Sequence, residues 1–288
     1  MKRIRSILLM LLAVSMLVTF VGCNDEEESN SKKKNETNNS IEQTNQIDEE
    51  NGENPIATMV VEYIDEKGNK EEGTIKLELY PDKAPITVAN FVNLVNNNFY
   101  NGLTFHRIVD DFMIQGGDPD GNGTGGALLS DLDKSIQKGS DKDHKYSIKG
   151  EFSSNGINNK VKFEAGTIAM ARSDYSSLGM AEEGYNSACS QFFIMNTDDS
   201  RTNSYLEGNY AAFGKVIEGY DVVTKISKTK VTSNGSELSK PVSAPVIKSL
   251  DIDTKGKVYD VPETINAEVT EKKIQELYNQ YYNLTQDN

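Results

Sequence analysis

The sequence has few of the residues that build disulfide frameworks and metal sites. It contains two cysteines and two histidines among 288 residues. Cys23 and Cys189 lie in very different contexts, so neither a disulfide framework nor a cysteine-rich metal site is predicted. His106 and His144 cannot complete a three-ligand zinc centre without carboxylates. We therefore expect no metal and no other cofactor.

Basic residues are also scarce relative to acidic ones. There are 30 Lys and Arg against 44 Asp and Glu, which gives a formal net charge of −14. Because phosphate binding requires a basic face, no nucleic-acid partner is expected. The acidic surplus is typical of a protein that charge repulsion keeps soluble, and we expect a monomer.

Long apolar runs are limited to the N-terminus. Lys2, Arg3 and Arg5 are followed by an apolar run at residues 7–21. The run is too short for a comfortable membrane span, and a positive start before a short apolar stretch is typical of a secretory signal. We predict a signal peptide at residues 1–22.

The end of this signal resembles the lipobox of bacterial lipoproteins. The run ends on Gly22-Cys23, although Phe20 stands where leucine is usual. This resemblance implies a lipid on Cys23, with the protein anchored to the cell membrane on its extracytoplasmic face. A plain signal peptide that leaves a free thiol is the alternative.

Residues 23–55 contain little that a folded core could use. They are rich in Asn, Glu, Ser, Lys and Gln, with Ile41 and Ile47 as the only sizeable apolar residues before Pro55. Such a segment buries too little apolar surface to offset the entropy of ordering. We predict a disordered, acidic tether.

The folded domain is expected at residues 56–254, and periodicity predicts mostly β-structure. Alternating apolar residues at 59–63 and 75–79 flank a turn and indicate a hairpin. Helical spacing after a proline predicts a helix at 85–97, and a second helix is predicted at 220–227. Further short strands are predicted at residues 167–172, 190–196, 210–217 and 246–252. Short strands at regular spacing favour an all-β sandwich or barrel.

Two segments are expected to lie outside this β-structure. Residues 127–148 are charged and predict a surface excursion. Residues 255–288 form a C-terminal extension, in which an apolar stripe at helical spacing predicts one amphipathic helix at 270–284. That helix either packs on the barrel or binds a partner.

The chemistry is expected at residues 105–126, FHRIVDDFMIQGGDPDGNGTGG. Apolar anchors next to Arg107 and Gln115, followed by glycines, are typical of a shallow apolar pocket edged by fixed donors. A plain strand and turn is the alternative. The Asp-x-Asp-x-Asn-Gly stretch resembles half a calcium loop, but Leu129 stands where the bidentate glutamate is needed. A hydrolase is not favoured, because no G-x-S-x-G motif occurs.

Several motifs together resemble the cyclophilins, which are peptidyl-prolyl cis–trans isomerases. The resemblance covers residues 56–252. Besides the stretch at 79–90, its motifs occur in that family's order: FHR at 105–107, FMIQGGD at 112–118, GTGG at 123–126, GEF at 150–152, IAMAR at 168–172, SQFFI at 190–194 and FGKV at 213–216. The resemblance implies a closed eight-stranded antiparallel β-barrel capped by two α-helices. It also implies that proline-containing polypeptides are the clients, here exported or surface proteins whose folding is assisted.

The chemistry of X-Pro isomerisation explains why one cation and an apolar niche for the proline ring are enough for catalysis. Rotation about an X-Pro bond is slow because the twisted state loses amide resonance, a barrier of ~18–20 kcal/mol. An enzyme therefore needs only to bind the twisted amide better than either planar form. The resemblance makes Arg107 the catalytic guanidinium aimed at the prolyl nitrogen, and Gln115 the amide that fixes it. A proline-peptide binding module with weak catalysis is the alternative.

The resemblance also assigns the substrate-binding residues. Phe112, Met113, Phe193 and Leu206 match the wall of the proline niche, and Ala171, Arg172 and Gln191 match the neighbouring groove. His106 belongs to the first motif and is included among the binding residues. Tyr205 and Tyr210 stand where many eukaryotic members have tryptophan and histidine, so the rim differs and tight cyclosporin binding is in doubt.

Overall fold

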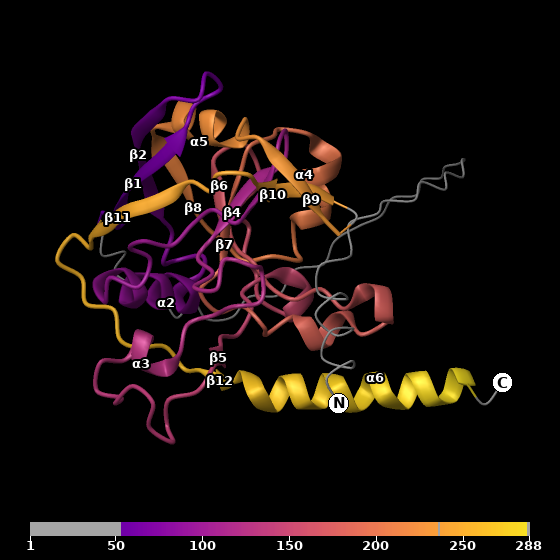
Figure 1. Ribbon diagram of the computed structural model, residues 1–288. Coiled ribbons are helices and arrows are strands. Elements are labelled where there is room, and N and C mark those ends of the chain that lie inside the picture. Colours follow the sequence, from indigo (N-terminus) through magenta and orange to yellow (C-terminus); the bar gives the residue numbers. More distant parts are fainter. Residues whose placement is uncertain (1–52, 236, 287–288) are drawn as a thin grey trace, which may run out of the picture. The chain divides into compact units, whose positions relative to one another are not determined.

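A strongly curled antiparallel sheet of eight strands forms the centre of the domain (Figure 1). The computed structural model describes residues 53–235 and 237–286, so the predicted signal peptide, Cys23 and nearly all of the tether lie outside the described residues. The strand order is β11-β1-β2-β8-β6-β7-β4-β3. The strands are β1 Ile56–Ile64, β2 Lys70–Leu79, β3 Arg107–Val109, β4 Met113–Gly116, β6 Thr167–Met170, β7 Phe192–Met195, β8 Ala212–Glu218 and β11 Val246–Asp253.

The prediction of a closed barrel is wrong, because no strand ladder joins β11 to β3 in the described residues. The two edges meet only through local contacts. Thr104 forms an isolated bridge with Val246, and the Phe105 N–H donates to the carbonyl oxygen of Pro245 at 3.0 Å. These contacts are made by residues before β3, and among the described residues the three-residue β3 itself pairs only with β4. The sheet is therefore an open half-barrel.

The main core lies on the concave face of the sheet and is covered by two helices. Along β1, every second residue is buried, as the alternation of a strand requires. Helix α2 (Pro85–Asn96) buries its apolar stripe against this core and contacts β11, and helix α5 (Tyr220–Ser227) contacts β2 and β4. Both helices and the β1–β2 hairpin confirm the predictions from periodicity.

Three further helices, three 3-10 turns and two small strand pairs complete the described part of the chain. The helices are α3 Leu129–Leu132, α4 Ser200–Leu206 and α6 Ala267–Gln286, with 3-10 turns at Ser153–Asn155, Ser176–Leu178 and Ala181–Gly184. Two small antiparallel pairs also form: β9 (Val231–Asn234) with β10 (Glu237–Pro241), and β5 (Tyr146–Ser147) with β12 (Ile265–Asn266). None of the helices in the described ranges has the length and apolar character needed to cross a bilayer.

Residues 127–148 are more than the predicted surface excursion. Tyr146 is 1% exposed, Ile148 is fully buried, and the Tyr146 hydroxyl donates to Asn90 Oδ1 at 2.7 Å. The charged residues around these anchors hid them, and β5 is only two residues long, too short for its alternation to stand out in the sequence. Strand β5 within this segment also pairs with β12, so the C-terminal extension is tied to the domain before α6 begins (Figure 1).

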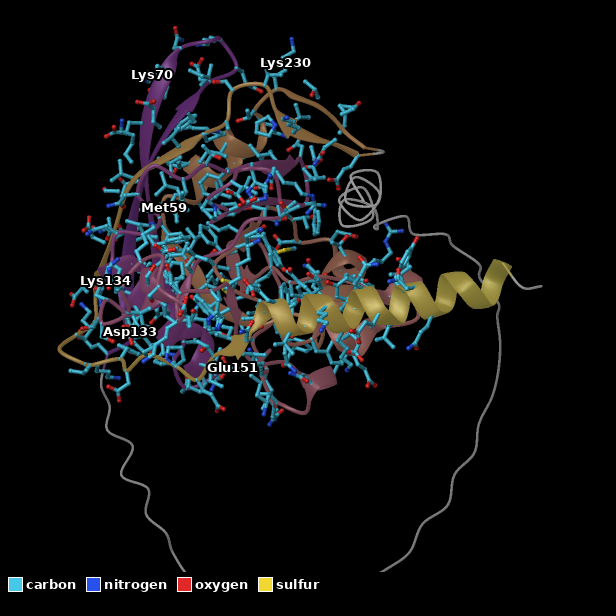
Figure 2. The ribbon with its side chains drawn as sticks, turned by 60° about the horizontal axis from the view of Figure 1, so that its bottom comes forward. Met59, Lys70, Asp133, Lys134, Glu151 and Lys230 are labelled. Atoms are coloured by element: carbon cyan, nitrogen blue, oxygen red, sulfur yellow. The ribbon has the colours of Figure 1, made fainter. Side chains whose placement is uncertain are left out.

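Helix α6 includes the helix predicted at 270–284. Its Ile274 is 7% exposed, and Lys273 forms an ion pair with Glu183 at 2.8 Å. These contacts support the interpretation that α6 packs on its own domain. Figure 2 shows Glu151, which caps α2, at the opposite end of the view from Lys70, the first residue of β2, and Lys230, which directly precedes β9.

Candidate functional site

The outer face of the sheet carries a second apolar cluster. Along β7, Phe192 and Ile194 point into the main core, whereas Phe193 and Met195 belong to the outer cluster. This is the alternation of a strand in which both faces are buried. The same alternation on β6 and β4 places Ala169 and Met113 beside Phe193. An apolar surface therefore crosses three adjacent strands.

This outer cluster contains the predicted wall of the proline niche. Its buried members are Met113, Phe163, Ala169, Phe193, Met195, Leu206, Tyr210 and Ala212, with Val109, Phe112, Val161 and Ala171 packed against them. The ring of Phe193 stacks on Phe163, with centroids 6.3 Å apart, and meets Tyr210 edge-on at 5.8 Å. Phe112 and Phe193 thus lie on the same side of the sheet. Phe163 and Met195 were not predicted.

Arg107 lies at the edge of this cluster because of strand register. On β3 it is paired with Gln115 of β4, which is in turn paired with Phe193 of β7. Arg107 Nη1 donates to Gln115 Oε1 at 3.1 Å and approaches Met113 Sδ at 3.8 Å. The predicted catalytic pair is therefore in direct contact, beside the apolar wall.

The amide of Gln115 continues this network into the glycine-rich turn. Its Nε2 donates to Gln191 Oε1 at 2.9 Å, and Gln191 Nε2 donates to the carbonyl oxygen of Gly125 at 2.8 Å. Gln191 orients the amide of Gln115, and the carbonyl oxygen of Gly125 orients the amide of Gln191. The Gln115 Oε1 atom is therefore fixed as the acceptor that faces Arg107. The structure thus brings Arg107, Gln115 and Gln191 together, as the sequence motifs imply.

The turn after β4 is organised by hydrogen bonds to Asp118. The Asp118 carboxylate accepts the N–H groups of Asp120 and Asn122 at 2.8 and 3.0 Å. Gly117 has φ +82°, and a Cβ there would collide with the Ser190 carbonyl oxygen. The glycine in this position is required by both backbone angle and close approach. In the described residues no cluster of His, Cys, Asp and Glu is arranged to hold a metal ion.

The strongest contact of Arg107 is one that the sequence did not predict. Glu237 at the start of β10 accepts Nε at 2.7 Å and Nη2 at 2.6 Å, which makes a bidentate ion pair. The side chains are 23% and 30% exposed. Partial burial raises the pKa of Glu237, but the hydrogen bonds and charge of Arg107 outweigh this effect and lower it below the usual glutamate value. The two residues are 130 positions apart, and no local pattern links them.

Arg172 lies in an aromatic cage at the groove. Its guanidinium carbon is 4.6 Å from the ring centroid of Tyr210 and 5.4 Å from that of Tyr185. Its Nε donates to the carbonyl oxygen of Asn209 at 2.8 Å. The Arg172 cation thus stabilises the ring of Tyr210, which also borders Phe193. Burial raises the pKa of Tyr210 to about 12, so its hydroxyl stays protonated at neutral pH.

The remaining predicted residues occupy different surroundings. Tyr205 on α4 is 49% exposed and donates to Asp174 Oδ2 at 3.2 Å, at the rim next to buried Leu206. The N–H of Ala171 donates to the carbonyl oxygen of Gln191 at 2.9 Å. This bond joins the residue after β6 to the residue before β7, so the two predicted groove residues lie side by side. These contacts place the rim and groove residues around the outer cluster.

His106 does not join the outer cluster. It is 8% exposed, and neither ring nitrogen has a hydrogen-bond partner among the described residues. Burial lowers its pKa, and the nearby charge of Asp118 raises it less. Among the described residues, no hydroxyl group is hydrogen-bonded to His106.

Comparisons with known proteins agree with these motifs. A family model described as cyclophilin type peptidyl-prolyl cis-trans isomerase/CLD matches residues 63–252. A peptidyl-prolyl cis-trans isomerase of Acinetobacter baylyi is 39% identical over 181 residues, which cover 62% of this chain and 80% of that protein. Crystal structures of a Cryptosporidium parvum cyclophilin type peptidyl-prolyl cis-trans isomerase are also similar to the chain. One is 25% identical with TM-score 0.47, covering 68% of this chain and 98% of that chain. Another, determined in the presence of the dipeptide Ala-Pro, is 27% identical with TM-score 0.46, covering 67% and 98%.

Proposed function

Because this chain belongs to the cyclophilin-type peptidyl-prolyl cis–trans isomerase family, we propose that it accelerates X-Pro rotation with Arg107 as the catalytic group. The single observation that carries the proposal is the contact of Arg107 with Gln115 and Met113 at the edge of the outer cluster. This arrangement combines a fixed guanidinium with an apolar surface in one site.

In the proposed mechanism the proline ring binds the apolar wall formed by Phe112, Met113, Phe193 and Leu206. Rotation of the amide returns the lone pair to the prolyl nitrogen, and a hydrogen bond from Arg107 stabilises that lone pair. Gln115 keeps the guanidinium in place and offers its amide to a substrate carbonyl. No covalent bond forms or breaks, so the rate gain comes from binding the twisted state more tightly than the planar ones.

A rate measurement tests this role. Two-dimensional exchange NMR on a Xaa-Pro peptide with the purified full-length protein should show faster cis–trans exchange. Arg107→Ala should reduce the catalysed rate by about 100- to 1,000-fold, the loss seen when one fixed charge-stabilising donor is removed. Lysine lacks the planar fork, so Arg107→Lys should restore little. Peptide binding without acceleration by the unaltered protein would identify a binding module instead.

We further propose that a lipid on Cys23 anchors the protein to the membrane surface and that its clients are exported proteins containing proline. The support is the sequence of residues 1–23, with its positive start, apolar run and terminal Gly-Cys. Mass spectrometry of the mature N-terminal peptide tests the anchor. A Cys23 that carries diacylglyceryl and acyl groups is expected, and a free thiol would contradict it.

A further inference from the structure

We propose that Glu237 is a positioning residue for Arg107, holding the guanidinium so that its Nη1 edge stays beside Gln115 and Met113. The inference rests on the proposed catalytic role of Arg107 and adds a residue outside the matched motifs. Glu237 is carried by the β9–β10 hairpin, which lies between α5 and β11 in the chain.

The ion pair fixes the plane of the guanidinium. The Glu237 carboxylate accepts hydrogen bonds from Nε and Nη2 of Arg107. Gln115 Oε1 accepts from Nη1, which is the other terminal nitrogen of the guanidinium. Parallel fork-to-fork bonds of this kind define both distance and orientation, which a single contact cannot do. Three of the five N–H donors of an arginine are thereby committed to oxygen atoms of the protein, and Nη1 also makes the weaker contact with Met113 Sδ at 3.8 Å. The remaining donors are on the two terminal nitrogens, of which Nη1 lies next to the apolar wall.

The hairpin presents Glu237 toward the domain by strand alternation. On β10, Ser239 is fully buried and Pro241 is also buried, whereas Leu238 is 61% exposed. This burial pattern places part-buried Glu237 on the inward side with Ser239 and Pro241, although the pairing with β9 has a bulge between Leu238 and Lys240. The hairpin base is closed by the N–H of Val242, which donates to the carbonyl oxygen of Lys230 at 2.8 Å. The position of the Glu237 carboxylate is thus fixed by the backbone of a closed hairpin.

The geometry favours positioning over inhibition. A carboxylate that blocked the reaction would occupy the edge of the guanidinium that faces the apolar wall. Glu237 instead holds the Nε–Nη2 edge, and Nη1 contacts Met113. Without Glu237, Arg107 would keep one hydrogen bond to Gln115 and gain rotamer freedom, so the productive orientation would be populated less often.

The test compares Glu237→Gln and Glu237→Ala with a matched control, Glu218→Gln. Glu218 on β8 is also a strand glutamate in an ion pair, with Lys76 at 2.8 Å, but it lies outside the Arg107 network. Exchange NMR on an Ala-Pro-containing peptide gives the Kd and the interconversion rate of bound peptide separately. We expect both Glu237 variants to lose about tenfold in interconversion rate, equivalent to about 1.4 kcal/mol. The Kd should change less than about twofold, because the apolar wall is intact.

NMR can also follow the Arg107–Glu237 ion pair directly. The Nε–H resonance of Arg107, assigned by its loss in Arg107→Ala, should be protected from solvent exchange in the unaltered protein and in Glu218→Gln. It should lose that protection in Glu237→Ala. Rates in the Glu237 variants equal to that of Glu218→Gln, or higher than it, would overturn the inference while leaving Arg107 catalytic. If Arg107→Ala itself keeps full activity, the proposed function is what fails.

Discussion

Glu151 caps helix α2 from 64 residues away: its Oε2 accepts the backbone N–H of Thr87 at 2.7 Å and the Thr87 hydroxyl at 2.6 Å. Its Oε1 accepts the N–H of Ile86 at 3.0 Å. The helix has Pro85 in its first turn and Ala84 before it, so its own sequence offers no side-chain cap. A long-range carboxylate satisfies the free N–H groups and lies at the positive end of the helix dipole.

Replacing this cap should destabilise the domain markedly. Glu151 is 2% exposed, so Glu151→Ala leaves buried N–H groups without partners. We expect a loss of about 1–3 kcal/mol in the free energy of unfolding, measured by urea denaturation. Asp199→Ala, which removes an exposed cap on α4, is the comparison and should cost less. Equal effects of the two substitutions would contradict the assigned role of burial.

Sequence patterns predicted the parts of the fold that are local. The β1–β2 hairpin, α2 and α5 follow from alternation and helical spacing within about ten residues, and the structure confirms them. Closure of the sheet could not be judged in this way, because it depends on whether β3 and β11 meet along their length. The family resemblance implied a closed barrel, and the three-residue β3 leaves it open.

The same limit applies to the site. Arg107, Gln115 and Phe193 could be predicted because their motifs fix strand register, and the structure pairs Arg107 with Gln115 and Gln115 with Phe193 on neighbouring strands. Glu237 was missed because it lies in a hairpin with no apolar signal and reaches Arg107 only in the folded chain. Phe163 was missed for a similar reason: it lies outside a strand and packs on Phe193 only through tertiary contact.

The aromatic cage around Arg172 should require a planar cation. The guanidinium lies 4.6 Å from the Tyr210 centroid and 5.5 Å from that of Phe152. Lysine retains the charge but cannot stack or donate along the same plane. We expect Arg172→Lys to lower the free energy of unfolding by about 0.5–2 kcal/mol in urea denaturation. If Arg172→Lys is as stable as the unaltered protein, charge alone holds the cage.

The Cys189 thiol should be unreactive in the folded protein. Burial raises its pKa to about 12, so almost no thiolate is present at neutral pH. The residue keeps some exposed surface, but Sγ approaches the carbonyl oxygen of Ala127 at 3.6 Å and is enclosed. Iodoacetamide at pH 8, followed by peptide mass spectrometry, should label Cys189 only after denaturation in urea. Labelling of the native protein at the rate of a free thiol would refute the prediction.

The contribution of Glu237 to stability should depend on pH in one direction. Arg107 lowers the pKa of Glu237 below the usual value of 4.5, against the opposing effect of burial. A carboxylate with a lowered pKa in the folded state stabilises that state when it is ionised. This contribution is therefore complete at pH values well above 4.5 and is lost as pH falls through the lowered folded-state pKa.

Urea denaturation across pH 3–7 can isolate this contribution by comparing the unaltered protein with Glu237→Gln. The difference in free energy of unfolding should be constant near neutral pH and should shrink on acidification below about pH 4.5, because protonated glutamate and glutamine are both neutral. The Glu218→Gln control reports what an exposed pair contributes, since the Glu218 side chain is 63% exposed and its pair is screened by solvent. A difference that grows toward low pH would mean that the pKa of Glu237 is raised above 4.5 in the folded state, which contradicts the assigned stabilisation of its carboxylate by Arg107.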